Sequence, residues 1–326
     1  MGARRASRAV LPPRLPMRAP PAPVGPAPAS PLAVALALSA VYLVWGSTYL
    51  AIRFALEGGW PPLLMGGVRF IVAGSFLYAV LRLRGTPAPT RMQWRNTAFV
   101  GLLLLAVGNG LVCVAEQTVS SGLAAVAVAS MPLWMALFSA LRGDRPRRVE
   151  WIGLGVGFAG VAWLNAGSSL TATPTGLVAL LVAAVAWAYG SVWSRGRDLP
   201  SPFMGAAAQM LCGGVAMLAV GLLLGERFDG WPDARGLLSV GYLASVGSLV
   251  GFSAYIWLLH HVRPALAGSY AYVNPVIAVL LGAWLAGERF GAHDIGAMAV
   301  VLSGVVAISL AKARRAPAPR PAEERA

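Results

Sequence analysis

Long apolar segments alternate with short polar segments along most of the chain. Ten apolar runs, most of them near 20 residues, have the length that an α-helix needs to cross ~30 Å of hydrocarbon. They are continuously apolar, whereas barrel strands are shorter and alternate, so the pattern predicts helices. The predicted spans are residues 32–52, 62–82, 97–115, 122–141, 150–167, 176–194, 203–224, 237–259, 266–286 and 292–311.

The composition agrees with a protein that lies in a lipid bilayer. Hydrophobic residues make up 57% of the chain and charged residues 12%, about half of the ~25% that soluble domains carry. The mean hydropathy is +0.68. A net charge of +14 could suggest a nucleic-acid partner, but the arginines lie between the apolar runs and at both ends. We therefore predict the bilayer and a small-molecule substrate as partners, and no nucleic acid.

The placement of the basic residues predicts the orientation. If the N-terminus is cytoplasmic, 21 Lys and Arg residues fall on the cytoplasmic side and only four on the other. This asymmetry follows the positive-inside rule. It predicts a multi-pass protein of a bacterial inner membrane with both termini in the cytoplasm. The Pro/Ala/Arg-rich segment 1–31 and the tail 312–326 are expected to be disordered.

The two halves of the chain share short motifs at a steady spacing. Residues 45–47 (WGS) and 189–191 (YGS) lie 144 apart, and residues 121–125 (SGLAA) and 264–268 (PALAG) lie 143 apart. Pro132 and Pro275 repeat the spacing of 143. Five helices per half make the second copy enter the membrane upside down, as in the inverted repeats of secondary transporters. The predicted repeats are residues 32–167 and 176–311.

Several runs resemble one known family. They are residues 44–49 (VWGSTY), 67–70 (GVRF), 105–110 (LAVGNG), the pair at 115–116 (AE) and residues 264–275 (PALAGSYAYVNP). On these runs the sequence resembles the EamA branch of the drug/metabolite transporter superfamily. The resemblance implies a ten-helix permease with two five-helix repeats that exports small metabolites or drugs, and it implies no particular substrate.

Two charged residues are candidates for function. Arg69 lies about seven residues into the second span, where a charge costs about 2.5–3.5 kcal/mol and usually faces a cavity. It could anchor an anionic group of the substrate, or it could be structural and pair with helix-end carbonyls. Glu116 ends the third span. Burial would suit it to proton coupling, and the alternative is a solvated charge at a helix end.

The ninth span carries a further group of polar candidates, Tyr270, Tyr272 and Asn274, just before Pro275. A proline inside a helix disrupts the hydrogen bond to the carbonyl four residues back, here Ala271, and Pro132 does the same to Val128. Freed carbonyls at membrane depth are tolerated where they line a cavity. The two prolines are therefore predicted hinges that shape a central cavity, or else simple kinks.

The repeat itself suggests the remaining substrate-binding candidates. Trp45 and Tyr189 occupy equivalent positions, so a pseudo-twofold would set them facing each other, where they could stack on a planar or cationic substrate. Packing or lipid-facing roles are the alternative. The other polar candidates inside spans are Ser47, Asn109, Ser191 and Gln209. A serine can instead bond to its own helix.

The remaining motifs do not indicate a cofactor-binding site or a metal site. Residues 155–160 read G-x-G-x-x-G but lie in an apolar span without a preceding strand. We expect Gly153 and Gly157 there to permit close helix packing. Cys113 and Cys212 lie in apolar runs and are expected to pack rather than pair, and three histidines form no Cys/His cluster.

These patterns predict a secondary transporter and not an enzyme. No phosphate-binding G-x-x-x-x-G-K-[ST] motif occurs, so an ion gradient, with protons favoured, would drive export by alternating access. An uptake permease of the same fold is the alternative. A membrane receptor or scaffold would need a soluble domain, and an intramembrane enzyme would need a nucleophile beside a base. Both a monomer and a homodimer remain open.

Overall fold

The computed structural model describes residues 30–143, 148–165, 173–262, 266 and 269–313, and these contain helices but no strands. The predicted leader 1–31 and tail 312–326 lie almost wholly outside the described residues. The helices are α1 Pro31–Glu57, α2 Pro62–Leu83, α3 Arg91–Gly101, the π-helix η1 Leu102–Asn109, α4 Gly110–Ala115, α5 Ser121–Val128, α6 Met131–Leu141, α7 Arg148–Asn165, α8 Pro174–Ser194, α9 Pro202–Leu223, α10 Ala234–Tyr242, the π-helix η2 Leu243–Val250, α11 Gly251–His261, α13 Tyr270–Leu285 and α14 Ala292–Ala313.

Seven helical stretches among the described residues are long and apolar enough to cross a membrane. The prediction of an all-helical membrane protein is confirmed at this level. The predicted spans 150–167, 266–286 and 292–311 coincide with shorter apolar helices, at Trp151–Gly160, Val273–Leu285 and Ala292–Ala307. The count of ten spans therefore stays a prediction.

Local signals at the helix starts explain why the chain turns where it does. Thr90 and Gln93 form a reciprocal capping box at the start of α3, and Asp233 accepts a hydrogen bond from Gly236 N at the start of α10. Such side chains satisfy backbone donors that the first turn of a helix leaves free. Proline begins α1, α2, α8 and α9, where its missing N–H costs nothing.

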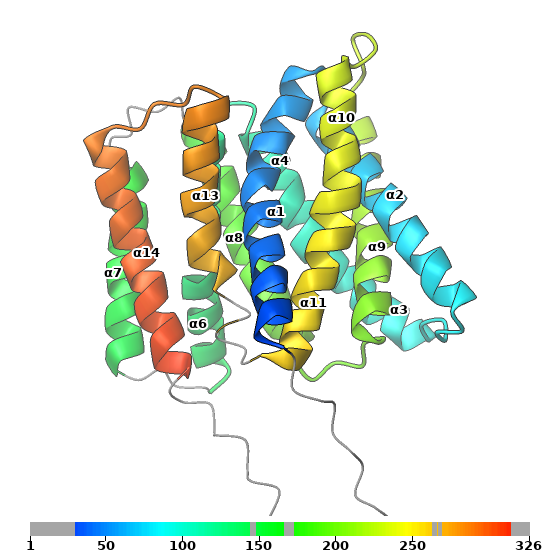
Figure 1. Ribbon diagram of the computed structural model, residues 1–326, viewed down its shortest axis with the longest axis horizontal. Coiled ribbons are helices and arrows are strands. Elements are labelled where there is room, and N and C mark those ends of the chain that lie inside the picture. Colours follow the sequence, from blue (N-terminus) through cyan, green and yellow to red (C-terminus); the bar gives the residue numbers. More distant parts are fainter. Residues whose placement is uncertain (1–29, 144–147, 166–172, 263–265, 267–268, 314–326) are drawn as a thin grey trace, which may run out of the picture.

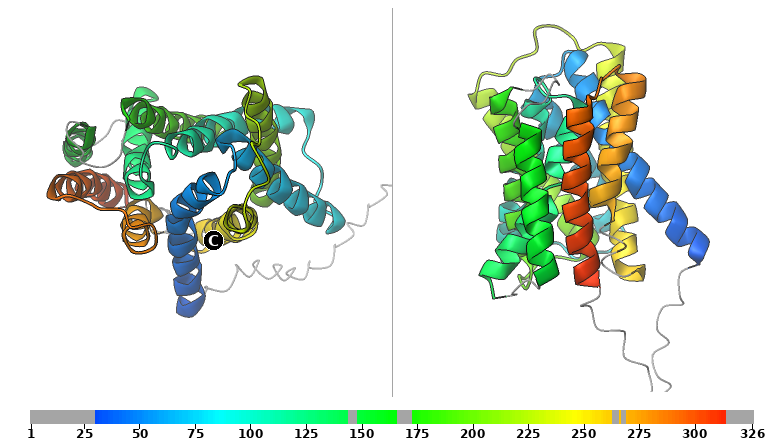
Figure 2. Two further views of the ribbon diagram at one scale, coloured as in Figure 1. Left: turned by 90° about the horizontal axis from the view of Figure 1, so that it is seen from above. Right: turned by 90° about the vertical axis from the view of Figure 1, so that its left-hand side faces the viewer.

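The helices stand side by side as one bundle (Figure 1). The first residue of α1 and the last turn of α14 lie at the same end of it, which is the lower end in Figure 1. Viewed from above, α7 and α14 lie together at one side, and α2 and α3 lie at the other (Figure 2). Helices from early and late parts of the chain are thus interleaved across the bundle.

The contacts between helices come in matched sets. α2 packs along α9, and α7 packs along α14. α1 packs on α13, while α8 packs on α5 and α6, which hold the corresponding place in the other half. In the same way α3 contacts α9, and α10 with η2 contacts α2. Exchanging the two halves of the chain leaves these named pairs unchanged, whereas the contacts of α1 with α5 and of α14 with α6 have no counterpart of similar extent among the described residues.

Glycine lets the paired helices approach closely. A Cβ atom on Gly304 of α14 would lie 2.5 Å from Gly157 N and 2.6 Å from Gly153 O of α7. The prediction that Gly153 and Gly157 serve helix packing is therefore confirmed, and their partner is α14. A Cβ atom on Gly67 of α2 would likewise lie 2.9 Å from Leu218 N of α9.

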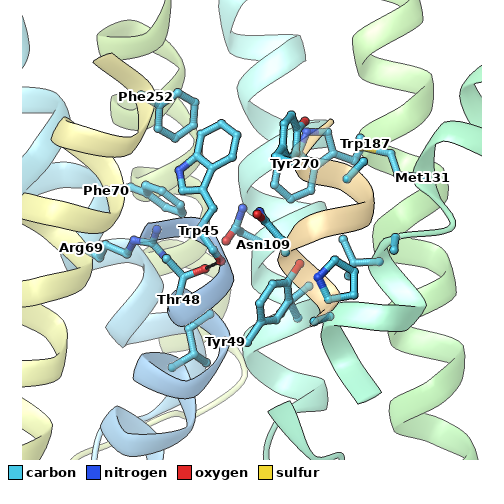
Figure 3. A pocket seen from close by; sticks show the side chains of 18 residues that line it. Trp45, Thr48, Tyr49, Arg69, Phe70, Asn109, Met131, Trp187, Phe252 and Tyr270 are labelled. Carbon is cyan, nitrogen blue, oxygen red and sulfur yellow. Dashed lines mark hydrogen bonds between the residues drawn. The ribbon is translucent and has the colours of Figure 1, made fainter. Parts of the chain in front are cut away.

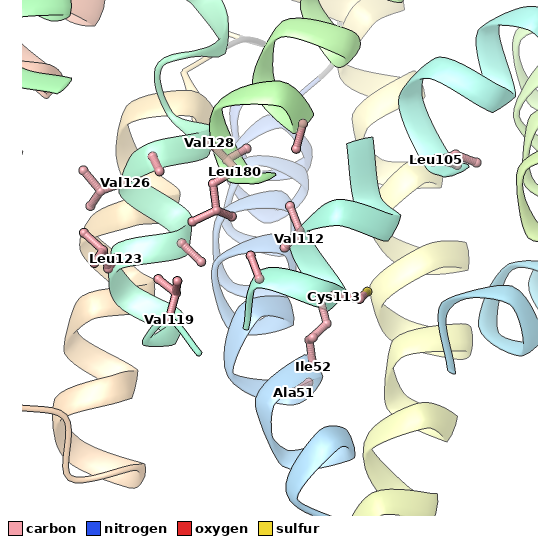
Figure 4. Packing of buried hydrophobic residues seen from close by; sticks show 14 of the residues in the cluster. Ala51, Ile52, Leu105, Val112, Cys113, Val119, Leu123, Val126, Val128 and Leu180 are labelled. Carbon is pink, nitrogen blue, oxygen red and sulfur yellow. The ribbon is translucent and has the colours of Figure 1, made fainter. Parts of the chain in front are cut away.

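The apolar core surrounds α5 near the middle of the bundle. Figure 4 shows Leu123 and Val126 of α5 packed near Leu180 of α8, with Val112 of α4 and Ile52 of α1 beyond them. All eight residues of α5 are buried. Cys113 is a buried free thiol in the same cluster, and Cys212 of α9 is a free, half-buried thiol.

Candidate functional site

A cavity opens between the helices, lined by residues of α1, α2, η1, α4, α5, α6, α8, α11 and α13 (Figure 3). Its volume is about 90 Å³. Ligand pockets for small molecules commonly fall between about 300 and 1,000 Å³, so the cavity is narrow in this conformation. Because both halves of the chain contribute walls, the cavity would change shape if they moved relative to each other.

Arg69 is the charged side chain of the cavity. It is only 5% exposed, and its guanidinium points from α2 toward Trp45 and Thr48 of α1 (Figure 3). Its Nε donates to Ser248 Oγ at 3.1 Å, and its Cζ lies 4.7 Å from the centre of the Phe70 ring. The structure gives Arg69 no ion pair with a described acidic residue. A buried cation without a counter-ion is costly, so it needs a functional or structural reason.

One of the two π-helices, η2, supplies partners for Arg69 and Trp45. η1 and η2 begin 141 residues apart, at corresponding places in the two halves. In η2, Ser248 Oγ donates to Leu243 O at 2.9 Å while it accepts from Arg69, and Gly247 O accepts from Trp45 Nε1 at 3.2 Å. A π-turn widens the helix and redirects its carbonyls, and such turns are frequent at functional sites.

Aromatic rings form one wall of the cavity around Trp45. The Trp45 ring centre lies 4.9 Å from that of Tyr270, 5.4 Å from that of Phe252 and 5.2 Å from that of Tyr255. The first two pairs are edge-to-face, a geometry that aromatic rings prefer. Trp45 is thus held by rings from α11 and α13 and by the hydrogen bond to Gly247.

Helix breaks lie beside the cavity. The fourth predicted span is divided into α5 and α6 at Ala129 and Ser130, immediately before Pro132. Pro275 lies inside α13 and lines the cavity itself. Val128 and Ala271, the residues expected to lose a hydrogen bond to these prolines, both line the cavity as well. Pro132 does not reach it, and whether either proline acts as a hinge stays a prediction.

Two asparagines complete the polar lining. Asn274 is 7% exposed, and its Oδ1 has no hydrogen-bond partner among the described residues. Asn109, at the end of η1, faces the middle of the cavity (Figure 3). The structure therefore gathers six of the residues singled out in the sequence, namely Trp45, Arg69, Asn109, Tyr270, Asn274 and Pro275.

The other predicted substrate-binding residues lie elsewhere. Tyr189 is 41% exposed and packs on Phe138 at 5.5 Å, so it does not face Trp45. Trp187 lines the cavity in its place. Two residues turn a helix by roughly 200°, which directs the two side chains to opposite faces. The expected pairing of Trp45 with Tyr189 is therefore wrong.

Polar residues near these positions are engaged in other contacts or lie away from the cavity. Ser47 Oγ donates to Val44 O at 2.9 Å and lies 2.6 Å from the Tyr242 hydroxyl, on another face of α1. Ser191 lies on α8 and Gln209 on α9, and neither lines the cavity. Tyr272 belongs to α13, but its side chain is outside what the structure describes.

Glu116 directly follows the candidate span Arg91–Ala115. It is 5% exposed, and neither carboxylate oxygen accepts a hydrogen bond of normal geometry from the described residues. Burial raises the pKa of this carboxyl well above its ordinary value, the Glu288 carboxylate raises it further, and Arg53 lowers it. The alternative of a solvated charge at a helix end does not fit this burial, and Arg53, Val119 and Ser120 line the same pocket as Glu116.

A network of ion pairs joins helix ends near Glu116. Glu288 Oε1 accepts from Arg53 at 2.7 Å and from Ser121 N at 2.8 Å, and Glu288 Oε2 accepts from Gly122 N at 3.1 Å. Glu57 pairs with Arg53 at 2.9 Å and with Arg235 at 3.3 Å. We call these residues the outer network (Arg53, Glu57, Arg235 and Glu288). It ties α1, α5, α10 and the segment after α13 together.

Sequence reasoning missed several residues of the lining, among them Thr48, Tyr49, Trp187 and Phe252. Thr48 and Tyr49 belong to the run VWGSTY, so their signal was present and went unused. Trp187 and Phe252 are aromatic residues in apolar spans. Nothing in such a span distinguishes a ring that faces a cavity from one that faces lipid.

A bundle of apolar helices around a cavity with a buried cation defines a membrane transporter for a small molecule. The chain belongs to the EamA-like transporter family, whose model matches residues 32–166 and again residues 174–310. This confirms the resemblance seen in the sequence, and with it the expectation of a transporter rather than an enzyme.

Individual relatives extend over most of the chain. It is 47% identical over 277 residues to the inner membrane transporter YedA of Escherichia coli (strain K12), covering 85% of this chain and 90% of that protein. A Salmonella typhimurium (strain LT2) protein named "Probable amino-acid metabolite efflux pump" is 23% identical, covering 81% and 91% of the two chains. A crystal structure with a TM-score of 0.63 and 23% identity covers 87% of this chain and 99% of that one, which supports the fold alone.

Proposed function

We propose that this protein is a secondary transporter that exports a small metabolite, amino acid or drug across a bacterial inner membrane by alternating access. The observation that carries the proposal is the cavity: both halves of the chain build it, and it holds the buried Arg69 without a described counter-ion. Trp45, Asn109, Tyr270 and Asn274 are the proposed substrate contacts beside Arg69. Contact of substrate with Ser47, Tyr189, Ser191 or Gln209 has no support from the geometry.

The proposed architecture is ten spans in two inverted repeats, residues 32–167 and 176–311. Three observations support it: the family model matches twice, the helix contacts come in matched sets, and the two π-helices lie 141 residues apart. Inverted repeats permit one half to rock against the other around a site near the midplane. With both termini cytoplasmic, the outer network lies at the extracytoplasmic end.

The outer network is the proposed closure of that end. It joins α1 and α5, both of which line the cavity, to Glu288 in the segment that follows α13. Opening toward the outside would require these contacts to break. Glu116, buried beside Arg53 and Glu288, is the proposed proton carrier, because its raised pKa lets it hold a proton that an ordinary glutamate would release.

An efflux and resistance screen in a strain that lacks its own exporters tests the transport function and identifies a substrate. With that substrate, Arg69→Ala should abolish transport at normal membrane abundance. Arg69→Lys should rescue only in part, since lysine keeps the charge but not the planar five-donor fork. Abundance and transport are measured on the same preparations. Normal transport by well-expressed Arg69→Ala protein would remove Arg69 from the site.

A further inference from the structure

The cavity lining carries one cation and no anion among its described residues. Arg69 is its charged member, and the remaining lining is apolar, aromatic, hydroxyl or amide. The guanidinium has five N–H donors, and Nε is the one that the structure pairs with a protein acceptor, Ser248 Oγ. The donors at the end of the fork are directed toward the cavity (Figure 3).

A single negative charge on the ligand matches this lining. A guanidinium binds a carboxylate through two parallel hydrogen bonds, and the pair is strengthened where water is excluded. A ligand with two negative charges, such as a phosphate ester, would keep one of them uncompensated among apolar groups. A cationic ligand would be repelled by Arg69, and no described carboxylate lines the cavity to receive it.

The aromatic wall indicates the chemistry of the uncharged part of the ligand. Phe252 and Tyr270 each pack against Trp45, and Trp187 and Met131 lie on the side of the cavity away from Arg69 (Figure 3). Rings bury large apolar areas and stack edge-to-face or offset against a further ring. The wall therefore suits an apolar or aromatic group joined to the charged end of the ligand.

The geometry points to a substrate that is a small monocarboxylate with an apolar or aromatic body. Its carboxylate binds Arg69, and its body lies against Trp45, Phe252 and Tyr270. This inference rests on the proposed transport function and names the substrate class of the same cavity. The carboxylate end and the apolar end are held by different helices, α2 on one side and α1, α11 and α13 on the other.

Equilibrium binding to the purified full-length protein in detergent tests the class with four probes. They are 3-phenylpropionate, its neutral amide 3-phenylpropanamide, the cationic 3-phenylpropylamine, and succinate, which has two charges and no apolar body. We expect 3-phenylpropionate to bind at least about tenfold more tightly than each of the others, because only it satisfies both ends of the cavity. Equal or tighter binding of the amide or the amine would overturn the inference, as would no binding of 3-phenylpropionate.

Three variants tie the selectivity to Arg69. Arg69→Gln should abolish the preference for the acid over the amide, and Arg69→Lys should retain part of it. Arg84→Gln removes an exposed arginine at the end of the same helix and should bind like the parent protein. Thermal unfolding of each variant establishes that it is folded. If Arg69→Gln does not fold, loss of the preference in a folded Arg69→Lys protein supports the inference, and an unchanged preference there overturns it.

The screen for transport separates this inference from the proposed function. A neutral or cationic compound exported through the cavity would leave the transporter proposal standing and overturn the substrate class. Selective binding of 3-phenylpropionate with no export of any compound would support the substrate class and contradict the transport proposal.

Discussion

At the scale of single residues, Gly251 leaves room for the indole of Trp45. A Cβ atom there would overlap Nε1 and lie 2.8 Å from Cδ1 of that ring, whereas a Cβ on Gly241, earlier in the same helical stretch, would meet nothing within 4 Å. The aromatic wall therefore depends on the absence of a side chain at position 251.

Gly251→Ala should displace Trp45, break its hydrogen bond to Gly247 O and lower substrate affinity by about tenfold, as loss of a hydrogen bond of about 1 kcal/mol and of ring packing implies. Gly241→Ala is the matched control and should be neutral or stabilising by up to about 1 kcal/mol, since alanine favours helix. Substrate binding and thermal unfolding of both variants check this. Equal affinities would show that the position of Trp45 is unimportant.

Glu116 makes a residue-scale prediction about pH. Its pKa is raised in the folded protein, so between the ordinary glutamate pKa of about 4.3 and the raised value the folded state holds a proton that the unfolded state releases. The free energy of unfolding contributed by this group should therefore fall as pH rises through that window. Thermal unfolding of the parent protein and of Glu116→Gln across pH should show a weaker pH dependence in the variant.

The same variant tests proton coupling. Glu116→Gln cannot release a proton, so it should lose uphill transport driven by a pH gradient while it still exchanges substrate across vesicles without one. Uphill transport at the parental rate would show that the proton travels by another group, and loss of exchange as well would assign Glu116 to the structure rather than to coupling.

At the scale of helices, Glu288 holds the first turn of α5. Its side chain is 2% exposed and receives hydrogen bonds from Ser121 N, Gly122 N and Arg53, while Glu57 of the same network is 43% exposed. A buried carboxylate at a helix N-terminus is stabilised by free amides and by the helix dipole. An exposed ion pair contributes only about 0–1 kcal/mol.

Glu288→Gln should therefore lower stability by about 1–3 kcal/mol, because hydrogen bonds to a charged acceptor are lost and Arg53 is left without its buried partner. Glu57→Gln is the control, with an expected loss below about 1 kcal/mol. Thermal or denaturant unfolding in detergent compares the two variants. If Glu288→Gln is no less stable than Glu57→Gln, the outer network does not fasten α5 as described.

At the scale of the whole molecule, orientation is the prediction that the basic residues support. A reporter that is active only outside the cytoplasm should give a signal when fused after Ser168, in the predicted loop between the fifth and sixth spans. The same reporter fused after Arg147 should stay silent, because the positive-inside rule keeps that arginine-rich loop in the cytoplasm. The reversed result would contradict the topology.

The sequence by itself determined the helices, the membrane and the family, because these follow from local properties. Hydropathy over some 20 residues predicts a span, and runs such as VWGSTY and PALAGSYAYVNP carry the family pattern. Arg69 could be singled out for a similar reason, since a charge inside an apolar run is costly wherever the helix packs.

The tertiary structure alone decided which side chains share the cavity. Trp45 and Tyr189 match in sequence, yet only Trp45 lines the cavity, and Trp187, two residues before Tyr189, faces it instead. The orientation of a helix about its axis depends on packing with helices far away in the chain, and an all-round apolar helix carries little periodic signal to reveal it. The placement of Arg53 and Glu288 beside Glu116, and the hydrogen bonds of Glu288 to the start of α5, are likewise contacts between distant segments, which no local pattern encodes.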